Sequence, residues 1–227
     1  MNKLIYVKPI KSRYQGEIGD VIVGRIVEVQ ADRWMVDFGG TQYASLPLGG
    51  ITLPGNEQRR RIDEDKLQMR DYFREGDLIS CEIQKLMESG EAVLHMRSNK
   101  YSTLQNGQLL QIDSSLVKRQ ASHVFNILND SVYLVIGNNG WLWIGAPAKK
   151  TGHIQSINFT QVVNTYRCVD EETRLRIVSV RSALFGLSVN LMEITSESIT
   201  TVIDVAAGAP VTPAVVAAAR SRLIQNS

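Results

Sequence analysis

The sequence predicts a chain of two domains, a small five-stranded β-barrel followed by an α/β domain. Between residues 20 and 96, five short runs rich in β-branched residues are separated by turn residues, and such a succession of short strands is typical of a small closed barrel. After residue 120 the sequence contains a hairpin pattern and then apolar residues at helical spacing, which indicates an α/β domain. A length of 227 residues is sufficient for both domains.

The composition excludes several classes of protein. A content of 44% hydrophobic and 21% charged residues is that of a globular chain and not of a disordered or collagen-like one. The net charge of +2 gives no overall field that would dictate a nucleic-acid partner, so any such site must be local. Two cysteines cannot build a disulfide framework and favour a reducing compartment. Neither a transmembrane helix nor a secretory signal is expected.

Each barrel strand can be placed on the sequence. The first is VIVGRIVEVQ, in which Gly24 permits the sharp coiling of a small barrel. The second and third strands are WMVDF and TQYASL, and the last two are LISCEIQKL and EAVLHM. Residues 47–69 form a long polar loop that contains the charge run RRRIDEDK. A loop of this length usually carries function.

The second domain begins with a hairpin and continues with helices. The runs VYLVI and WLWI flank an Asn-Gly turn at residues 137–140. Asp170 is the expected N-cap of a helix over residues 171–182, and further helices are predicted over residues 197–206 and 213–224. The apolar face of the first helix is predicted to contain Leu175, Val178 and Phe185. A strand is predicted from the alternation of Leu187, Val189 and Leu191.

Several sequence strings carry a family resemblance. GDVIVGRIVEV and REGDLISCEIQKL resemble the S1 domain, an RNA-binding OB barrel. A longer set is similar to the family of ribosomal RNA processing protein four, the S1/KH-type cap subunits of the eukaryotic RNA exosome. This set comprises VKPIKSRYQGEIGDVIVGRI, RWMVD, LPGNEQRRR, LQMRDYFREGDLIS, RSNKY, SLVKRQ and IGNNGWLWI. The matching strings follow one another closely from about Lys3 to Ile144.

The resemblance implies a domain organisation. It implies an S1-type OB barrel over residues 17–98, a connector over residues 99–120 and a KH-type α/β domain over residues 121–227. Members of the family carry a β-rich amino-terminal domain before the VKPIKSRY segment, and residues 1–16 are expected to be only a remnant or edge of it.

The resemblance also implies a function. Proteins of this family are non-catalytic RNA-binding cap subunits. They help assemble a ring of RNase PH-like subunits with the other cap subunits, and guide single-stranded RNA to an associated 3′-to-5′ exoribonuclease for degradation and processing, including that of rRNA. The nucleus, nucleolus and cytoplasm are the expected locations. A stand-alone S1-domain RNA-binding or translation factor, or a ribonuclease, remains an alternative.

Candidate RNA contacts are basic side chains and one tryptophan. Arginine suits phosphate because its guanidinium group donates paired hydrogen bonds. Arg59, Arg60 and Arg61 lie in the long loop, but the acidic residues 63–65 follow at once, so a self-paired surface helix is an equally open reading. Further candidates flank the barrel or, for the tryptophan, occupy the family's stacking surface: Arg70, Arg97, Lys100, Lys118, Arg119 and Trp34.

The Asn-Gly turn corresponds to the GxNG motif that replaces the usual KH loop in this family. Such a loop can cradle an RNA backbone through its glycine amides, but this one contains no basic residue and is flanked by Ile136 and Trp141. A structural role at the interface between S1 and KH is therefore favoured for Gly137, Asn138, Asn139 and Gly140.

No catalytic residue, metal ion or cofactor is expected. The three histidines are scattered over different predicted elements, with no thiol or carboxylate at a metal-site or nucleophile spacing. The acidic runs at residues 63–65 and 170–172 could in principle hold Mg²⁺, but helix capping and solvation explain them better.

Overall fold

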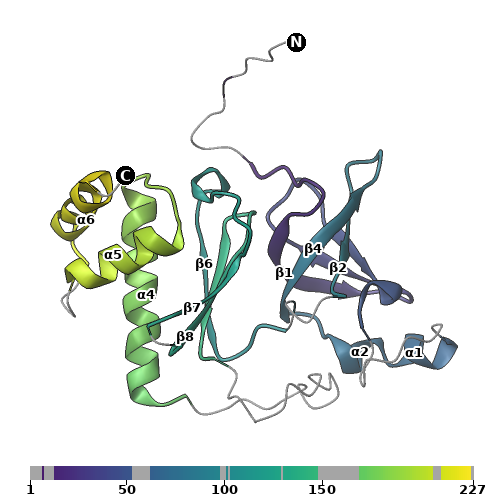
Figure 1. The fold of residues 1–227 in the computed structure, drawn as a ribbon. Coiled ribbons are helices and arrows are strands. Elements are labelled where there is room, and N and C mark those ends of the chain that lie inside the picture. The colour runs from purple at the N-terminus through teal and green to yellow at the C-terminus, as the bar shows by residue number, and fades with distance from the viewer. Residues whose placement is uncertain are drawn as a thin grey trace.

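The structure is a computed structural model that describes Val7 and residues 13–52, 62–97, 101, 103–128, 130–147, 169–206 and 211–225, except for the side chains of residues 64, 224 and 225. The described part contains a closed barrel and a second sheet that lie side by side (Figure 1). Three helices cover the face of the second sheet that points away from the barrel.

The predicted five-stranded barrel is confirmed. Its strands close in the order β1-β2-β3-β5-β4, with β3 and β5 parallel and the other pairs antiparallel. Bulges in β1 and β4 increase the local twist that closure requires. The strands are β1 (Val21–Val29), β2 (Arg33–Asp37), β3 (Ala44–Pro47), β4 (Leu78–Leu86) and β5 (Ala92–His95).

Alternation along the strands builds the barrel core. On β2, for example, Trp34 and Val36 point inward, whereas Arg33 is exposed. Beyond β3, the short elements η1 (Leu48–Gly50), α1 (Asp63–Leu67) and α2 (Met69–Tyr72) lead to Phe73. Phe73 is fully buried and packs edge-on against Trp34, with ring centroids 5.2 Å apart. Phe73 is therefore part of the barrel core.

The second sheet is antiparallel, in the order β6-β9-β8-β7. The predicted hairpin is confirmed, because β8 and β9 pair across the turn at residues 137–140. The expected connector over residues 99–120 is wrong in one respect, because it contains β6, an edge strand paired with β9. The run GQLLQ is too short to show a strand pattern by itself. The strands are β6 (Gly107–Gln111), β7 (Val124–Ile127), β8 (Val132–Ile136) and β9 (Trp141–Gly145), with η3 (Ser114–Leu116) after β6.

Three helices complete the second domain. They are α4 (Glu171–Val189), α5 (Ser196–Ala206) and α6 (Pro213–Gln225). Asp170 caps α4 as predicted, since its carboxylate accepts a hydrogen bond of 3.1 Å from the Thr173 amide. Both carboxyl-terminal helices are confirmed. Within the part of the chain that the structure describes, no helix is long and apolar enough to cross a bilayer.

Two expectations about α4 are wrong. The helix continues to Val189, so the strand predicted from Leu187, Val189 and Leu191 does not form. The chain turns directly after the helix, at Leu191, which has a φ of +52°. The predicted apolar face of Leu175, Val178 and Phe185 is exposed. The face toward the core consists instead of Ile177, Val180, Ala183, Leu184 and Leu187. Because α4 is apolar on two sides, its periodicity does not identify the buried one.

Candidate nucleic-acid interface and domain seam

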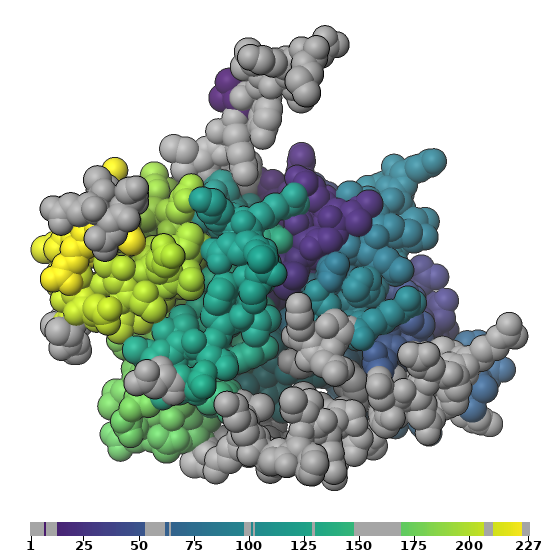
Figure 2. Space-filling view, viewed as in Figure 1, coloured from purple at the N-terminus to yellow at the C-terminus, as the bar shows by residue number. Residues whose placement is uncertain are grey.

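The barrel and the second sheet meet in a contact that we call the domain seam. Its apolar part is a cluster of buried side chains from both domains: Val23, Leu104, Val135 and Trp143. Its polar part is the turn at residues 137–140, which lies against β1. Figure 2 shows the second sheet, in teal, directly against the purple amino-terminal part of the barrel.

The two asparagines of the turn bond to the backbone of the barrel. The Asn139 amide nitrogen donates to the carbonyls of Val23 at 2.8 Å and Phe38 at 2.7 Å, and its Oδ1 accepts from the Val23 amide at 3.3 Å. The Asn138 backbone amide donates to the Val21 carbonyl at 2.8 Å. The ladder between β1 and β2 begins only at Arg25, so the turn supplies the partners that β2 does not provide to the start of β1.

Close approach makes the two glycines of the turn irreplaceable. Gly140 has a φ of +81°, and a Cβ there would lie 2.3 Å from the Ile112 carbonyl oxygen. A Cβ on Gly137 would lie 2.3 Å from Oδ1 of Asn139 and 3.0 Å from the Val23 nitrogen. Only glycine fits such positions without displacing backbone. In this structure the turn is therefore a docking element between the domains.

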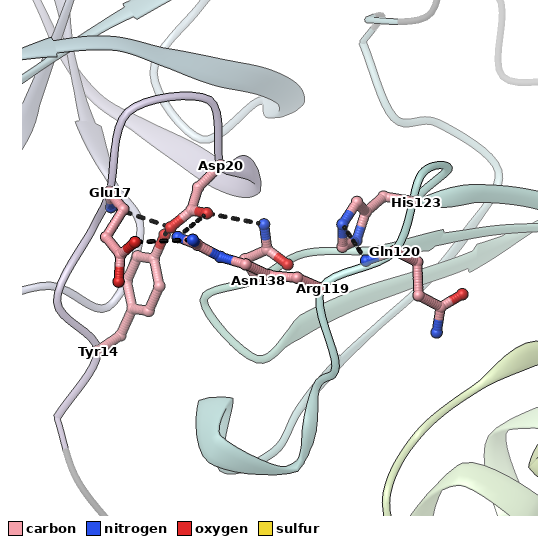
Figure 3. Close-up of polar contacts among 7 residues, drawn as sticks. All are labelled: Tyr14, Glu17, Asp20, Arg119, Gln120, His123 and Asn138. Atoms are coloured by element: carbon pink, nitrogen blue, oxygen red, sulfur yellow. Dashed lines mark hydrogen bonds and ion pairs between the residues drawn. The ribbon is translucent and has the colours of Figure 1, made fainter. Parts of the chain in front are cut away.

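Asp20 is the hub of a second group of contacts at the seam (Figure 3). The residue is buried and lies directly before β1. Its carboxylate accepts hydrogen bonds from two residues on the barrel side and two on the KH side. The donors are Tyr14 Oη at 2.6 Å, the Glu17 amide at 2.9 Å, Arg119 Nη2 at 2.6 Å and Asn138 Nδ2 at 3.1 Å. These four donors satisfy the hydrogen-bonding capacity of a carboxylate that is buried away from water.

The electrostatics of the hub follow from burial and pairing. Burial and the bond to Asp20 raise the pKa of Tyr14 well above its usual range, so its hydroxyl remains a donor. Burial lowers the pKa of Arg119, but the attraction of Asp20 and the 2.7 Å ion pair with Glu17 outweigh it, so the pKa is raised overall. Burial lowers the pKa of His123, whose Nδ1 faces the Ile136 carbonyl at 2.9 Å. We infer a neutral imidazole that donates from Nδ1.

A polar cavity of about 320 Å³ opens at the same place. Its lining comes from both domains and includes Asp20, Glu82, Tyr101, Arg119, Ser122 and Asn138. Tyr101 donates a hydrogen bond to Glu82, and Asn138 Oδ1 is buried without a partner among the described residues. One arginine opposes two carboxylates, so the lining is not a cradle for an anion such as phosphate.

The predicted RNA contacts are only partly placed by the structure. Arg59, Arg60, Arg61 and Lys100 lie outside the described residues. Arg70 pairs with Glu75 at 2.8 Å, and Lys118 lies 3.9 Å from Glu193.

Arg97 donates to the Gly49 carbonyl at 3.1 Å, and Arg119 belongs to the Asp20 hub. Each described basic candidate thus bonds to a different polar group, and the partner of Arg119 belongs to the domain seam.

Trp34 was predicted to contact RNA, and this is wrong. Its side chain is 0% exposed and its indole nitrogen donates to the Phe73 carbonyl at 3.2 Å. Strand alternation directs Trp34 into the core, and no other aromatic residue occurs on β2. Base stacking on β2 would therefore require another aromatic residue.

Sequence reasoning missed Asp20 and Tyr14 as seam residues. A single acidic residue before an apolar strand is typical of an ordinary turn. Its partners Arg119 and Asn138 follow 99 and 118 positions later, and no local pattern reports such contacts.

The described residues include no group of three or more His, Cys, Asp or Glu side chains that could hold a metal ion. Cys81 lies in the barrel core, where burial raises the pKa of its thiol. A buried, protonated thiol is not an effective nucleophile.

Comparison with known families assigns both domains. The family described as "RRP4, S1 domain" matches residues 13–85, and the family described as "KH domain" matches residues 107–150. The second match begins at β6, in agreement with the place of that strand in the second sheet. The chain is thus a protein of the S1 and KH class, with the barrel first and the KH domain second.

Relatives narrow this class to one family. Exosome complex component rrp4 of Schizosaccharomyces pombe is 40% identical over 209 residues, which cover 88% of this chain and 63% of that protein. The RRP4 component of Saccharomyces cerevisiae is 47% identical over 82% of this chain and 51% of its own length. That of Mus musculus is 49% identical over 63% of this chain and 49% of its own length. The chain belongs to the Rrp4 family of exosome components and spans about half to 63% of these relatives.

A solved structure supports the fold. A crystal structure assigned as an exosome complex RNA-binding protein matches 85% of this chain and 94% of its own length, with a TM-score of 0.54. The two sequences are 15% identical, so this likeness concerns the arrangement of the domains and not their ligands.

Proposed function

We propose that the chain is a non-catalytic, RNA-binding cap subunit of an RNA exosome. The observation that carries this proposal is the combination of an RRP4-type S1 barrel with a KH domain, fixed to each other by the GxNG turn. Identities of 40% to 49% with exosome components of fungi and a mammal support the same role.

The seam supports a guiding role. S1 barrels and KH domains each bind single-stranded RNA over a few nucleotides. Two such domains held in one orientation present a single continuous path and bind without first paying the entropy of domain ordering. The chain has a net charge of only +2, so RNA affinity of the isolated protein should be low and should rise when other subunits complete the path.

The proposed partners are single-stranded RNA, a ring of RNase PH-like subunits, the other cap subunits and an associated 3′-to-5′ exoribonuclease. The proposed locations are the nucleus, nucleolus and cytoplasm, which fluorescence microscopy of the tagged chain would test. Processing and degradation of RNA, including rRNA, are the proposed outcome of the assembled complex.

Reconstitution tests the role as a subunit. The purified chain is mixed with purified ring and cap subunits and analysed by size-exclusion chromatography, with end-labelled RNA as substrate in each fraction. We expect the chain to co-elute with the ring and to leave RNA intact when alone, whether phosphate or Mg²⁺ is supplied. Degradation of RNA by the homogeneous chain would instead support the ribonuclease alternative.

Charge reversal tests the RNA path. The double variant Arg97→Glu with Lys118→Glu should flatten the slope of log affinity against log salt for single-stranded RNA, by roughly 0.7 for each lost phosphate contact. The matched control is Arg220→Glu with Arg222→Glu on α6, which makes the same charge change away from the barrel. Equal slopes for both variants would show that neither Arg97 nor Lys118 contacts phosphate.

A further inference from the structure

One side of α4 exposes an apolar row that lies outside the core cluster of the described residues. Leu175, Val178, Phe185 and Val189 are 64%, 48%, 56% and 64% exposed. With Ser182 in the middle they follow the spacing three, four, three, four, which is that of positions a and d in a heptad repeat. We call these five residues the outer stripe. At 1.5 Å per residue the stripe is about 21 Å long.

The rest of α4 already has its packing partners. The opposite face, which includes Ile177, Val180 and Leu184, is buried in the core of the second domain. The flank at Gly186 is covered by Val216 of α6 and by Val211 just before this helix, since a Cβ on Gly186 would lie 3.1 Å from each of them. The outer stripe is therefore additional to the core, and a contiguous row of half-exposed large apolar side chains is a signature of an interaction surface.

Charge distinguishes the two edges of the stripe. Arg174 and Arg181 precede two of the stripe positions and occupy equivalent g positions one heptad apart. Neither guanidinium forms an ion pair in the part of the chain that the structure describes, whereas Arg176 pairs with Glu172 on the same helix. The other edge, at the e positions, carries the small residues Ser179 and Gly186. One edge is thus basic and the other is uncharged.

We propose that the outer stripe docks an amphipathic helix of a partner protein, whose apolar face covers the stripe and whose acidic residues face Arg174 and Arg181. The heptad spacing fits a helix crossing at about 20°, with its side chains between those of the stripe. Ser182 leaves room at the centre for a large side chain of the partner. This goes beyond the proposed RNA-binding role, because it assigns a protein contact to a helix outside the barrel and the seam.

A second copy of the chain is a poorer occupant. In an antiparallel pair of helices, g positions face g positions, so the two basic edges would meet and repel. In a parallel pair, g positions face e positions, and Arg174 and Arg181 would face Ser179 and Gly186 without a charge partner. An acidic helix satisfies the edge in either orientation.

Binding of defined peptides tests the proposal. The probe is a three-heptad helical peptide with leucine at a and d and glutamate at e and g, and its matched control carries lysine in place of glutamate. Methyl NMR of the full chain should show saturable shifts at Leu175, Val178 and Val189 with the glutamate peptide, at an affinity about tenfold above that for the lysine peptide. No shift at the stripe, or equal affinity for both peptides, would overturn the proposal.

Variants of the chain sharpen the test. Arg174→Glu with Arg181→Glu should transfer the preference to the lysine peptide, and Phe185→Ser should weaken both. The control Arg220→Glu with Arg222→Glu, on α6, should keep the preference for glutamate. A control that loses this preference equally would show a general charge effect and overturn the docking site.

Other occupants give distinct results. Concentration-dependent dimerisation abolished by Phe185→Ser in sedimentation would favour a second copy, and loss of oligouridylate binding in the same variant would favour RNA; either outcome overturns the proposal. Failure of the chain to co-elute with exosome subunits would contradict the proposed function and leave the peptide result unaffected, so the two failures are distinguishable.

Discussion

The domain seam and the outer stripe of α4 reverse the usual relation between polarity and burial. At the seam, Asp20, Asn138 and Asn139 are buried. On α4, leucine, valine and phenylalanine side chains are about half exposed. Asp20 accepts four hydrogen bonds and the Asn139 side chain forms three. The exposed apolar groups, in contrast, lie outside the core cluster of their own domain.

The difference shows that burial follows the availability of a partner surface. The start of β1 lacks its β2 neighbour, and only a side chain with both a donor and an acceptor can complete that edge, so an asparagine is buried there. Among the described residues of its domain, the outer stripe is not part of the packed core cluster. Substitutions at the two places should therefore have opposite consequences for stability.

The largest effect is expected at Gly140. An alanine there must adopt a φ of +81° and would place its Cβ 2.3 Å from a backbone oxygen, so strain and displacement together should cost about 4 kcal/mol of unfolding free energy. Gly90→Ala is the matched control, because Gly90 has a φ of +86° with nothing within 4 Å and should lose only about 1 to 2 kcal/mol. Equal losses in chemical denaturation would show that close approach at the turn is unimportant.

Asn139→Ala should lower the free energy of unfolding by about 3 kcal/mol, because three backbone groups of Val23 and Phe38 lose their partner in a buried place. Asn190→Ala serves as the control, since Asn190 is exposed and its side-chain amide donates to the Gly186 carbonyl at the end of its own helix. Its expected loss is about 0.5 kcal/mol. A loss at Asn139 no larger than that of the control would contradict the role of the turn as a docking element.

A smaller effect is expected from His123 and depends on pH. Burial lowers its pKa from the ordinary value of 6.5, and Asp20 and Arg119 face it with opposite charges. Well above pH 6.5 the imidazole is neutral in both the folded and the unfolded chain, so it contributes nothing to the pH dependence there.

Below that pH the unfolded chain takes up the proton more readily, so stability should fall until the folded histidine also titrates. His123→Gln should remove this part of the pH dependence in denaturation curves measured at several pH values. Superimposable pH profiles for wild type and variant would mean that His123 is not held neutral at the seam.

The smallest effect is expected on the outer stripe. Phe185→Ser should change the free energy of unfolding by less than about 0.5 kcal/mol, because the side chain lies outside the core. The neighbouring substitution Leu184→Ser, at a fully buried position, should cost about 3 kcal/mol or more. Similar losses at both positions in thermal denaturation would show that the stripe belongs to the core of the chain.

Local sequence patterns predicted most of the barrel and the β8-β9 hairpin. Alternation and turn residues place all five barrel strands. The apolar neighbours of the Asn-Gly turn favour a structural role, and in the structure Asn139 of this turn bonds to the barrel backbone. The edge strand β6 was missed because its pairing with β9 makes it a strand, and GQLLQ carries little local signal. The buried face of α4 was misassigned because both sides of the helix are apolar.

The candidate site was less predictable than the fold. Basic residues can be read from the sequence, but their partners are distant. Arg119, predicted to contact RNA, pairs with Asp20 and Glu17, which the sequence did not indicate. In the sequence Trp34 resembles a residue that stacks on RNA bases, but the alternation of β2 directs its side chain into the barrel core.

The affinity of Asn139→Ala for single-stranded RNA tests the central claim most directly, namely that the GxNG turn joins the two domains and does not hold RNA. The measurement uses fluorescence anisotropy with a labelled oligouridylate, at a temperature where denaturation curves show the variant to be folded. We predict an RNA affinity within about threefold of wild type, together with a large loss of unfolding free energy. Unchanged stability accompanied by an affinity loss of about tenfold or more would contradict this claim and identify the turn as part of the RNA site.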